Sequence, residues 1–366
     1  MPASMPKSLK VGILDDMADF SGRDDESPLG TTATGGLPPD LAGWIEREIG
    51  ALRQAGRFDA DVEFLHAYAL GLPSGTAEAV EQAYRQLAEA GACLIVGPAI
   101  GDNALAVTAL AEQLRIPTLN WSAAGRARGR WMFQYQVGSH EDEALVIARH
   151  MASLGLKRLA VVHEVSSLGT RQLKHLEAEA RVLGIEIIAH EGISPLAEDA
   201  ADAVAALLAA GPDGVVHLGG GGTAPAVARA LVHARWDGPR MMNTAGLRGF
   251  RGDFARACDG WFYVDMHSGA NVALQAVMAD LEAPSRHALA LARGHDIGRL
   301  VAEGLARAGD TSREGVRLGL EQVKWLPAAQ GHEGTLLGFG PSDHAALHGR
   351  YLVVRQWLGG ESREVI

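Results

Sequence analysis

Short apolar segments alternate with amphipathic helical segments along nearly the whole chain, and this alternation restricts the possible folds more than any other feature. The helical segments, such as TAEAVEQAYRQLAEAGA (76–92) and TRQLKHLEAEARVLG (170–184), carry apolar residues at helical spacing and include or end at a glycine. Strand–helix alternation is typical of parallel sheets that are covered by helices on both faces. We therefore predict an α/β fold.

The predicted strands form two sets, which suggests two similar lobes. A chain of 366 residues is long enough for two domains. The first set comprises 9–14, 61–68, 92–97, 117–121 and 133–138; the second comprises 158–165, 185–192, 214–220, 240–246 and 260–266.

An internal similarity supports the two lobes. CLIVGPAIGDNALAVTALAEQLRIPTLNWSAAG (93–125) and GVVHLGGGGTAPAVARALVHARWDGPRMMNTAG (214–246) each run from a strand through a glycine turn and an alanine-rich helix to an asparagine. The first glycine and the asparagine are 23 positions apart in one segment and 24 in the other. Either the two βαβ units are equivalent, with both turns at strand carboxyl ends where α/β sheets bind ligands, or the match is a chance product of composition.

Four consecutive glycines, Gly219 to Gly222, open the second of these helices. A P-loop would place Lys-Ser/Thr after the last glycine, and here no lysine or arginine occurs before Arg229. Three interpretations remain. The run is a tight turn with Thr223 as helix N-cap and Pro225 in the first turn, a ligand-pocket wall, or an anion site.

Composition excludes several classes of function. The net charge of −11 without a basic block argues against nucleic-acid binding, and no apolar run is long enough for membrane insertion. Cys93 and Cys258 are expected to be small buried side chains, with a disulfide or a reactive thiol as the alternative. MPASMPKSLKVGIL lacks the apolar core of a secretory leader, so the sequence as it stands predicts a cytoplasmic protein, or a periplasmic one whose leader was removed.

No catalytic constellation stands out, and we predict that the protein is not an enzyme. His344 and His348 are spaced to share one helix face with Asp343 nearby, but a third metal ligand is not evident. A solvated helix is the preferred interpretation of these residues. We predict no metal and no organic cofactor.

The order of these segments resembles the type I periplasmic binding proteins, specifically the branched-chain amino acid (Leu/Ile/Val) solute-binding proteins of ABC transporters. The resemblance lies in LKVGIL, in LAEAGACLIVGPAIGDNALAVTALAEQLRIPTLNWSAAG (87–125), and in FQYQVGSHEDEALVIARHM, LGLKRLAVVHEVSSLGTRQLKHLEAEARVLGIEI and GPDGVVHLGGGG. It implies two Rossmann-like lobes with parallel sheets, joined by a three-strand hinge, with a ligand held in the cleft between them.

Boundaries follow from this layout. Lobe 1 would comprise 1–138 plus 268–338, and lobe 2 would comprise 139–267 plus 339–366. The hinge crossings would lie near 137–139, 265–268 and 338–342. The helices at 285–308 and 312–325 would return to lobe 1, and the final strand at 350–357 would belong to lobe 2.

The resemblance also implies which residues contact the ligand. The turn after LIVGP offers Ile100, Asp102 and Asn103, and the turn after PTLNW offers Trp121, Ser122 and Ala123, where amino-acid binders hold a carboxylate. In lobe 2, Leu168 stands where relatives place a tyrosine, Gly220 and Gly221 where they place an aromatic residue, and Thr244-Ala245 where they place the acidic partner of the ligand's ammonium. Phe20, in a polar Gly/Pro-rich segment (19–40) that is either a solvated loop or a cleft-covering flap, and His267, in the second hinge segment, complete the predicted ligand-binding set.

These departures predict the class of ligand. An ammonium buried without a carboxylate partner costs several kcal/mol, so tight binding of free α-amino acids is not expected. Glycine in place of an aromatic wall would leave room for a bulkier apolar or aromatic acid or amide, with Trp121 and Phe20 as stacking candidates.

Three functions compete at this stage. The first is a solute receptor that closes about its hinge and hands a small molecule to an ABC permease. The second is a cytoplasmic small-molecule sensor that controls a regulatory partner protein. The third, an enzyme of two Rossmann-like lobes, lacks a nucleotide motif and an acid/base constellation.

Overall fold

The computed structural model describes residues 8–17, 40–72, 74–244, 257–282 and 288–365, which divide into two compact units. Unit 1 contains the chain up to residue 137 together with 267–351, and unit 2 contains 138–266 together with 352–366. Phe20, Ala245 and most of the segment 19–40 lie outside the described residues.

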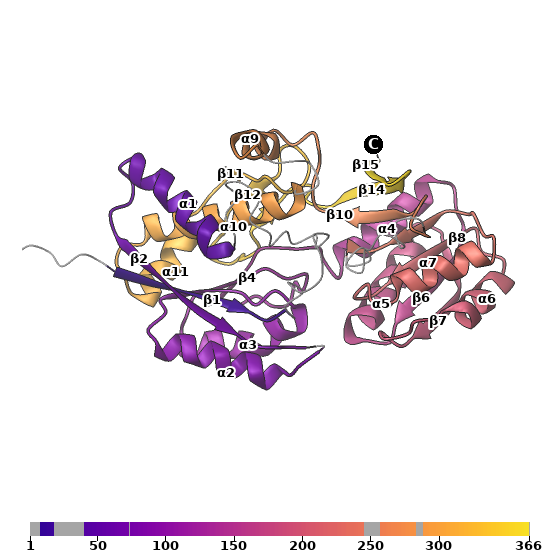
Figure 1. Cartoon of the computed structure of the whole chain (residues 1–366), viewed down its shortest axis with the longest axis horizontal. Coiled ribbons are helices and arrows are strands. Elements are labelled where there is room, and N and C mark those ends of the chain that lie inside the picture. Colours follow the sequence, from indigo (N-terminus) through magenta and orange to yellow (C-terminus); the bar gives the residue numbers. More distant parts are fainter. Residues whose placement is uncertain (1–7, 18–39, 73, 245–256, 283–287, 366) are drawn as a thin grey trace, which may run out of the picture. The chain divides into compact units, whose positions relative to one another are not determined.

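Unit 1 is built on a five-stranded parallel sheet with the order β2-β1-β3-β4-β5. In Figure 1, α2 and α3 run along one side of these strands, whereas α1, α10 and α11 lie on the other. Apolar side chains of the sheet and of α2 and α3 form the core on the face that α2 and α3 cover. The strands are β1 (Ser8–Asp15), β2 (Asp61–Tyr68), β3 (Leu94–Val96), β4 (Thr118–Asn120) and β5 (Met132–Gln134). The helices are α1 (Leu41–Gln54), α2 (Ala77–Glu89), α3 (Gly101–Leu114), α9 (Val272–Asp280), α10 (Ala288–Arg307) and α11 (Arg313–Glu321).

Unit 2 is built on a seven-stranded sheet with the order β15-β14-β10-β9-β8-β6-β7. Five strands are parallel, and β14 and β15 continue the sheet in antiparallel pairing. Its helices pack pairwise, α4 on α5 and α6 on α7. The strands are β6 (Arg158–Glu164), β7 (Glu186–Ile193), β8 (Gly214–Leu218), β9 (Arg240–Met242), β10 (Phe262–Asp265), β14 (Val353–Leu358) and β15 (Glu361–Glu364). The helices are α4 (Asp142–Ser153), α5 (Ser167–Val182), α6 (Ala201–Ala209) and α7 (Ala224–His233).

The two parallel sheets share one topology. Counting the strands of each unit in chain order, both sheets run 2-1-3-4-5, so the order reverses beside the first strand of each. The two similar sequence segments correspond to β3-α3-β4 and β8-α7-β9, and each pair of strands is parallel. Their asparagines, Asn120 and Asn243, are both buried and both donate to backbone carbonyl groups. The predicted equivalence of the two βαβ units is confirmed.

The third boundary between the units differs from the prediction. Residues 339–351, which the sequence layout assigns to lobe 2, belong to unit 1. The reason is a small sheet of β11 (Leu326–Pro327), β12 (Leu336–Leu337) and β13 (Leu347–His348), in which β13 pairs with β12. Ala345 also bridges to Gln134 of β5. These pairings hold the chain on unit 1 for some ten residues beyond the predicted crossing at 338–342.

The predicted helix around His344 and His348 is also wrong. His344 is buried, its ring stacks on Phe133 with centroids 3.9 Å apart, and its Nδ1 lies 2.6 Å from the Gly129 carbonyl oxygen. His348 belongs to β13, so the spacing of the two histidines does not reflect a helix face.

Candidate functional site

In unit 1, the point where strand order reverses lies between β1 and β3, and a buried carboxylate fills it. Asp16, directly after β1, accepts hydrogen bonds from Ala99 N (2.7 Å), Ile100 N (3.0 Å) and Asn103 Nδ2 (2.7 Å). These donors belong to the turn and first helical turn after β3, where α/β sheets commonly bind anions. Burial raises the pKa of Asp16, while these hydrogen bonds oppose the rise. The anion at this switch point is part of the protein.

In unit 2 the equivalent point lies between β6 and β8, and it is filled in the same way. Glu164, the last residue of β6, is buried and accepts from Gly220 N (2.5 Å), Thr223 N (3.0 Å) and Thr223 Oγ1 (3.0 Å). The four-glycine turn therefore donates a backbone hydrogen bond to an anion, as predicted if the glycine run is an anion site. That anion is the side chain of Glu164, and a ligand phosphate would have to displace it.

Two of the four glycines stand where a Cβ would clash with neighbouring atoms, Gly219 against Glu164 and Gly222 against Pro195. A Cβ on Gly219 would lie 2.6–2.7 Å from side-chain atoms of Glu164, and the φ of Gly219 is +144°. A Cβ on Gly222 would lie 2.8 Å from the Pro195 carbonyl oxygen. The interpretation of the run as a pocket wall cut back for a ligand is thus wrong at Gly219, because a side chain of the protein occupies that space.

Thr223 begins α7 as predicted, with Pro225 in its first turn, but its side chain does not cap the helix. Its hydroxyl donates to Glu164 and also lies 2.9 Å from Nε2 of His217. Burial lowers the pKa of His217 to about 4, while the charge of Glu164 acts in the opposite direction. His217 is therefore neutral at physiological pH.

A further buried carboxylate lies beside the predicted ligand residue Thr244. Glu143, in the first turn of α4, accepts from Thr244 N (2.8 Å), Thr244 Oγ1 (2.9 Å) and Ser139 N (2.7 Å). Thr244 therefore fixes the Glu143 side chain, which lies in the first turn of α4 near the start of unit 2. Sequence reasoning missed Glu143 because it stands among other acidic residues in SHEDEA and nothing in the pattern marks it as buried.

The other predicted residues of unit 2 lie near the carboxyl ends of its strands. Leu168 is half-buried in the first turn of α5, after β6. Gly220 is half-buried and Gly221 is buried, and both follow β8.

The predicted residues of unit 1 divide into framework and accessible groups. Asn103 is buried on Asp16, and Ser122 is buried with its hydroxyl donating to Asn120 Oδ1 (2.8 Å). The half-buried members are Ile100, Asp102, Trp121, Ala123 and His267. Trp121 and Ala123 follow the carboxyl end of β4, and the Trp121 indole N–H has no acceptor among the described residues.

Sequence reasoning missed Arg293, which lies over Trp121. The guanidinium carbon is 4.8 Å from the centroid of the Trp121 ring, and Arg293 is half-buried on α10. Its charge also acts on the buried Tyr135 phenol. Burial and Asp296 raise the pKa of Tyr135 well above its usual value, and Arg293 opposes that rise. The only sequence signal was an arginine within the otherwise apolar run ALALARG (288–294).

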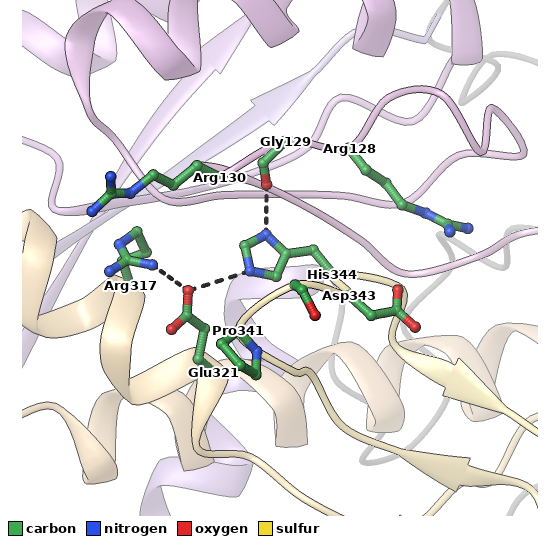
Figure 2. Close-up of a pocket in the computed structure, with 9 residues that line it drawn as sticks. Arg128, Gly129, Arg130, Arg317, Glu321, Pro341, Asp343 and His344 are labelled. Carbon is green, nitrogen blue, oxygen red and sulfur yellow. Dashed lines mark hydrogen bonds and ion pairs between the residues drawn. The ribbon is translucent and has the colours of Figure 1, made fainter.

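A pocket of about 730 Å³ opens elsewhere on unit 1, near the amino-terminal end of β5. Figure 2 shows the His344 ring between the Gly129 carbonyl and the Glu321 carboxylate, which also contacts Arg317. Arg317 in turn pairs with Glu314, so opposite charges in this pocket largely neutralise one another. It contains none of the predicted ligand residues.

Metal and membrane features are lacking in the part of the chain that the structure describes. No group of three or more His, Cys, Asp or Glu side chains there is placed to hold a metal ion. None of the described helices is both long and apolar enough to span a bilayer. Cys93 and Cys258 are free and buried.

Comparison with known proteins identifies relatives over nearly the whole chain. The sequence model of a family described as periplasmic binding protein matches residues 73–360. No curated protein sequence matches the chain.

Solved structures are similar over nearly the full length of the chain. A type 1 periplasmic binding protein from Bordetella pertussis superimposes with a TM-score of 0.75 at 17% identity, covering 98% of this chain and 100% of that one. A leucine-binding protein from Thermotoga maritima gives 0.74 at 15% identity, covering 98% of each chain. A solute-binding protein of an ABC transporter from R. palustris, in complex with 4-hydroxybenzoate, gives 0.72 at 14% identity, covering 98% of this chain and 96% of that one.

Proposed function

Because the chain belongs to the periplasmic binding protein family, with two similar α/β units of the type I fold, we propose that it is the solute receptor of an ABC-type uptake system. Its ligand is a small molecule with a bulky apolar or aromatic body and a carboxylate or amide group. Ligand contacts come from residues at the carboxyl ends of the parallel strands, which is where α/β sheets bind ligands.

The observation that carries the ligand class is the chemistry around Thr244. In the amino-acid binders that the chain resembles, an acidic side chain at this position binds the ligand's ammonium. Here the carboxylate bonded to Thr244, that of Glu143, already accepts three hydrogen bonds from Ser139 and Thr244. An ammonium ligand would have to compete with these donors, and a carboxylate whose acceptor sites are in use offers it little compensation for lost hydration.

Trp121 in unit 1 favours a ligand with an aromatic body. Trp121 stands half-buried at the carboxyl end of β4, and its indole N–H is buried without an acceptor among the described residues. An aromatic side chain with an unused donor suits a ligand that is largely apolar and carries a polar group. The solved relatives include proteins in complex with leucine and with 4-hydroxybenzoate, and we infer that this chain is closer in ligand chemistry to the latter.

A thermal-shift screen tests this proposal. The panel would contain the branched-chain amino acids, aromatic and alicyclic carboxylates, and the corresponding primary amides. A ligand at about 100 times its Kd adds about 2.7 kcal/mol to the stability of the folded state. We expect aromatic or alicyclic acids or amides to raise the Tm by several degrees and leucine, isoleucine and valine to leave it unchanged.

Two variants connect the screen to the predicted residues. Trp121→Ala in unit 1 and Leu168→Ala in unit 2 should each reduce the shift produced by the best ligand. Leu154→Ala, at an exposed position in unit 2, is the control and should not. Deletion of the gene should abolish uptake of the same radiolabelled compound by the cell, and unchanged uptake would contradict the transport role.

A further inference from the structure

The chain crosses between the two units at 137/138, 266/267 and 351/352, and one short segment of unit 1 contacts the chain beside all three crossings. This segment is residues 328–332, with the sequence AAQGH, and we call it the anchor segment. It lies between β11 and β12 and belongs to neither a helix nor a named strand. Four of its five residues are buried, so its position depends on the groups that bind it.

Gln330 connects the anchor segment to the first crossing. Its Nε2 donates to the Gln136 carbonyl oxygen at 3.0 Å, and its Oε1 accepts from the Tyr135 hydroxyl at 2.7 Å. Tyr135 and Gln136 are the third-last and second-last residues of unit 1 before the chain enters unit 2. All three side chains are buried, so these bonds are shielded from water and costly to lose.

The second crossing meets the anchor segment at Gly331. His267, the first residue of unit 1 after this crossing, forms a parallel β-bridge with Gly331. Four residues later, Asn271 Nδ2 donates to the carbonyl oxygens of Ala328 (3.0 Å) and Gly331 (3.1 Å). The buried Asn271 side chain also caps α9 through its Oδ1, so it joins this helix, the second crossing and the anchor segment.

The third crossing packs against the same glycine. The His332 N–H donates to the carbonyl oxygen of Arg350 at 2.9 Å, and Arg350 and Tyr351 are the last residues of unit 1 before this crossing. A Cβ on Gly331 would lie 2.7 Å from Cα of Tyr351, and the φ of Gly331 is +85°. A glycine is therefore required for the anchor segment to approach the third crossing this closely.

A buried carboxylate fixes the anchor segment to the rest of unit 1. Asp296 of α10 accepts from Ala329 N (2.8 Å) and Gln330 N (3.0 Å), and the Tyr135 hydroxyl lies 3.2 Å from its Oδ2. Asp296 is fully buried, and α10 packs against both α1 and α11. Hydrogen bonds from backbone N–H groups to a carboxylate are stronger than bonds between neutral groups. The helical layer therefore holds the anchor segment firmly.

We propose that Asp296 and Gln330 position the hinge, because through the anchor segment they hold the unit 1 ends of all three crossings as one block. The inference rests on the receptor function proposed above, in which the units close about a hinge. Since the three ends move together, bending is confined to the few residues at each crossing. In unit 2, Gly138 N donates to the sulfur of Met266, which joins the first two crossings on that side as well.

This block also affects ligand affinity. A loosely held hinge lets the ligand-free protein sample more arrangements, and ligand binding then has to restrict more conformational freedom. Asp296 and Gln330 are not among the predicted ligand residues, so they act on binding through the hinge.

Hydrogen exchange followed by mass spectrometry tests whether the three ends are held together. The variants are Asp296→Asn and Gln330→Met, and Glu303→Gln is the matched control. Glu303 is a buried carboxylate on the same helix, but it pairs with Arg57 and Arg307. Peptides that cover the anchor segment and the three unit 1 ends are compared with wild type. Thermal melts report whether each variant folds.

Asp296→Asn turns one of the two acceptor oxygens into an NH₂ group that faces a backbone donor. We expect the amides of the anchor segment to exchange about tenfold or more faster, and those at 135–137, 267–271 and 350–351 to accelerate with them. Gln330→Met keeps the carboxylate and should accelerate the amides at 135–137. The control should leave all these regions within about threefold of wild type.

Pulsed EPR distance measurements test the hinge itself. Spin labels are attached through Glu46→Cys on α1 and Val182→Cys on α5, at two exposed positions, whereas the native cysteines are buried. In the ligand-free protein, the distribution of distances between the labels should be broader in Asp296→Asn and Gln330→Met than in wild type. Glu303→Gln should keep the wild-type width. A purely structural role would lower the Tm without broadening the distribution.

Two results would overturn the inference. One is faster exchange that is confined to the anchor segment, with the three unit 1 ends exchanging as in wild type. The other is a distance distribution that is no broader in either variant than in the control. If Asp296→Asn does not fold, Gln330→Met alone supplies both readouts. Both measurements are made without ligand, so they decide the inference separately from the receptor function, which the thermal-shift screen tests.

Discussion

The two units solve the same structural problem with different residues. Both parallel sheets reverse their strand order beside the first strand, and both place the start of a helix there. In unit 1 the short side chain of Asp16 reaches backbone N–H groups of Ala99 and Ile100. In unit 2 the longer side chain of Glu164 reaches Gly220 and Thr223. Neither helix start has a side-chain cap of its own, and the distant carboxylate supplies one in each case.

The difference explains the first glycine of the run, Gly219. In unit 1, Asp16 accepts hydrogen bonds from a turn whose residues, Ala99 and Ile100, both carry side chains. Glu164 is one methylene longer and lies where a Cβ on Gly219 would be. A longer internal carboxylate therefore requires a turn with less side-chain volume. Glycines after a strand in an α/β chain indicate an anion close to the backbone, and here that anion is covalently part of the chain.

Removal of either carboxylate should have the largest effect on stability. Asp16→Ala and Glu164→Ala each leave three hydrogen-bond donors without their acceptor, and an unsatisfied buried donor costs about 1–3 kcal/mol. We expect each change to lower the free energy of unfolding by about 4 kcal/mol in urea denaturation, after partial hydration of the site. Asp61→Ala and Glu186→Ala, at exposed strand positions, are the controls. A loss no larger than theirs would mean that the carboxylates do not stabilise the helix starts.

A fall in pH should change the contributions of two buried groups to stability in opposite directions, that of Asp296 in unit 1 and that of His217 in unit 2. Asp296 in unit 1 has a pKa raised to about 6 by burial, above the ordinary 3.8. The folded state therefore binds this proton more tightly than the unfolded state, and the contribution of Asp296 to stability falls as pH rises from about 4 to 6. His217 in unit 2 has a pKa lowered to about 4 from 6.5, so its contribution rises with pH from about 4 to 6.5.

Each of these effects is on the order of 3 kcal/mol across its window. The measurement is the free energy of unfolding against pH for wild type, Asp296→Asn and His217→Gln. The difference between wild type and Asp296→Asn should decrease with rising pH, and the difference between wild type and His217→Gln should increase. Slopes of the same sign would show that one of the two groups does not titrate as its burial implies.

A smaller effect is expected at Gly219. Gly219→Ala introduces a Cβ against Glu164 at an unfavourable φ and should cost about 2–3 kcal/mol. Gly184→Ala, with a φ of +69° and no atom within 4 Å of the new Cβ, should cost only about 1 kcal/mol of backbone strain. If the two variants lost the same stability in thermal melts, the contact with Glu164 would not be the reason for a glycine at position 219.

The sequence predicted the parts of the molecule that depend on local pattern. Alternating strands and amphipathic helices reflect burial periodicity, and the second βαβ unit repeats that pattern at the same spacing, so the fold and its internal equivalence were accessible. Glu164 and Gly220 are 56 positions apart, and neither segment contains a pattern that predicts their contact. Arg293 and Trp121 likewise belong to separate elements, helix α10 and the turn after β4, whose contact no local pattern predicts. The burial of His344 likewise depends on a bridge between Ala345 and Gln134, which no helical spacing could predict.

Calorimetric titration with leucine and with the best-binding acid from the screen decides whether the protein is a receptor for bulky apolar acids or for free amino acids. We expect saturable binding of the acid with a stoichiometry of one and no binding of leucine at micromolar protein concentration. Sub-micromolar binding of leucine, isoleucine or valine would contradict it. That result would mean that the three hydrogen bonds to Glu143 do not prevent the protein from binding a ligand ammonium.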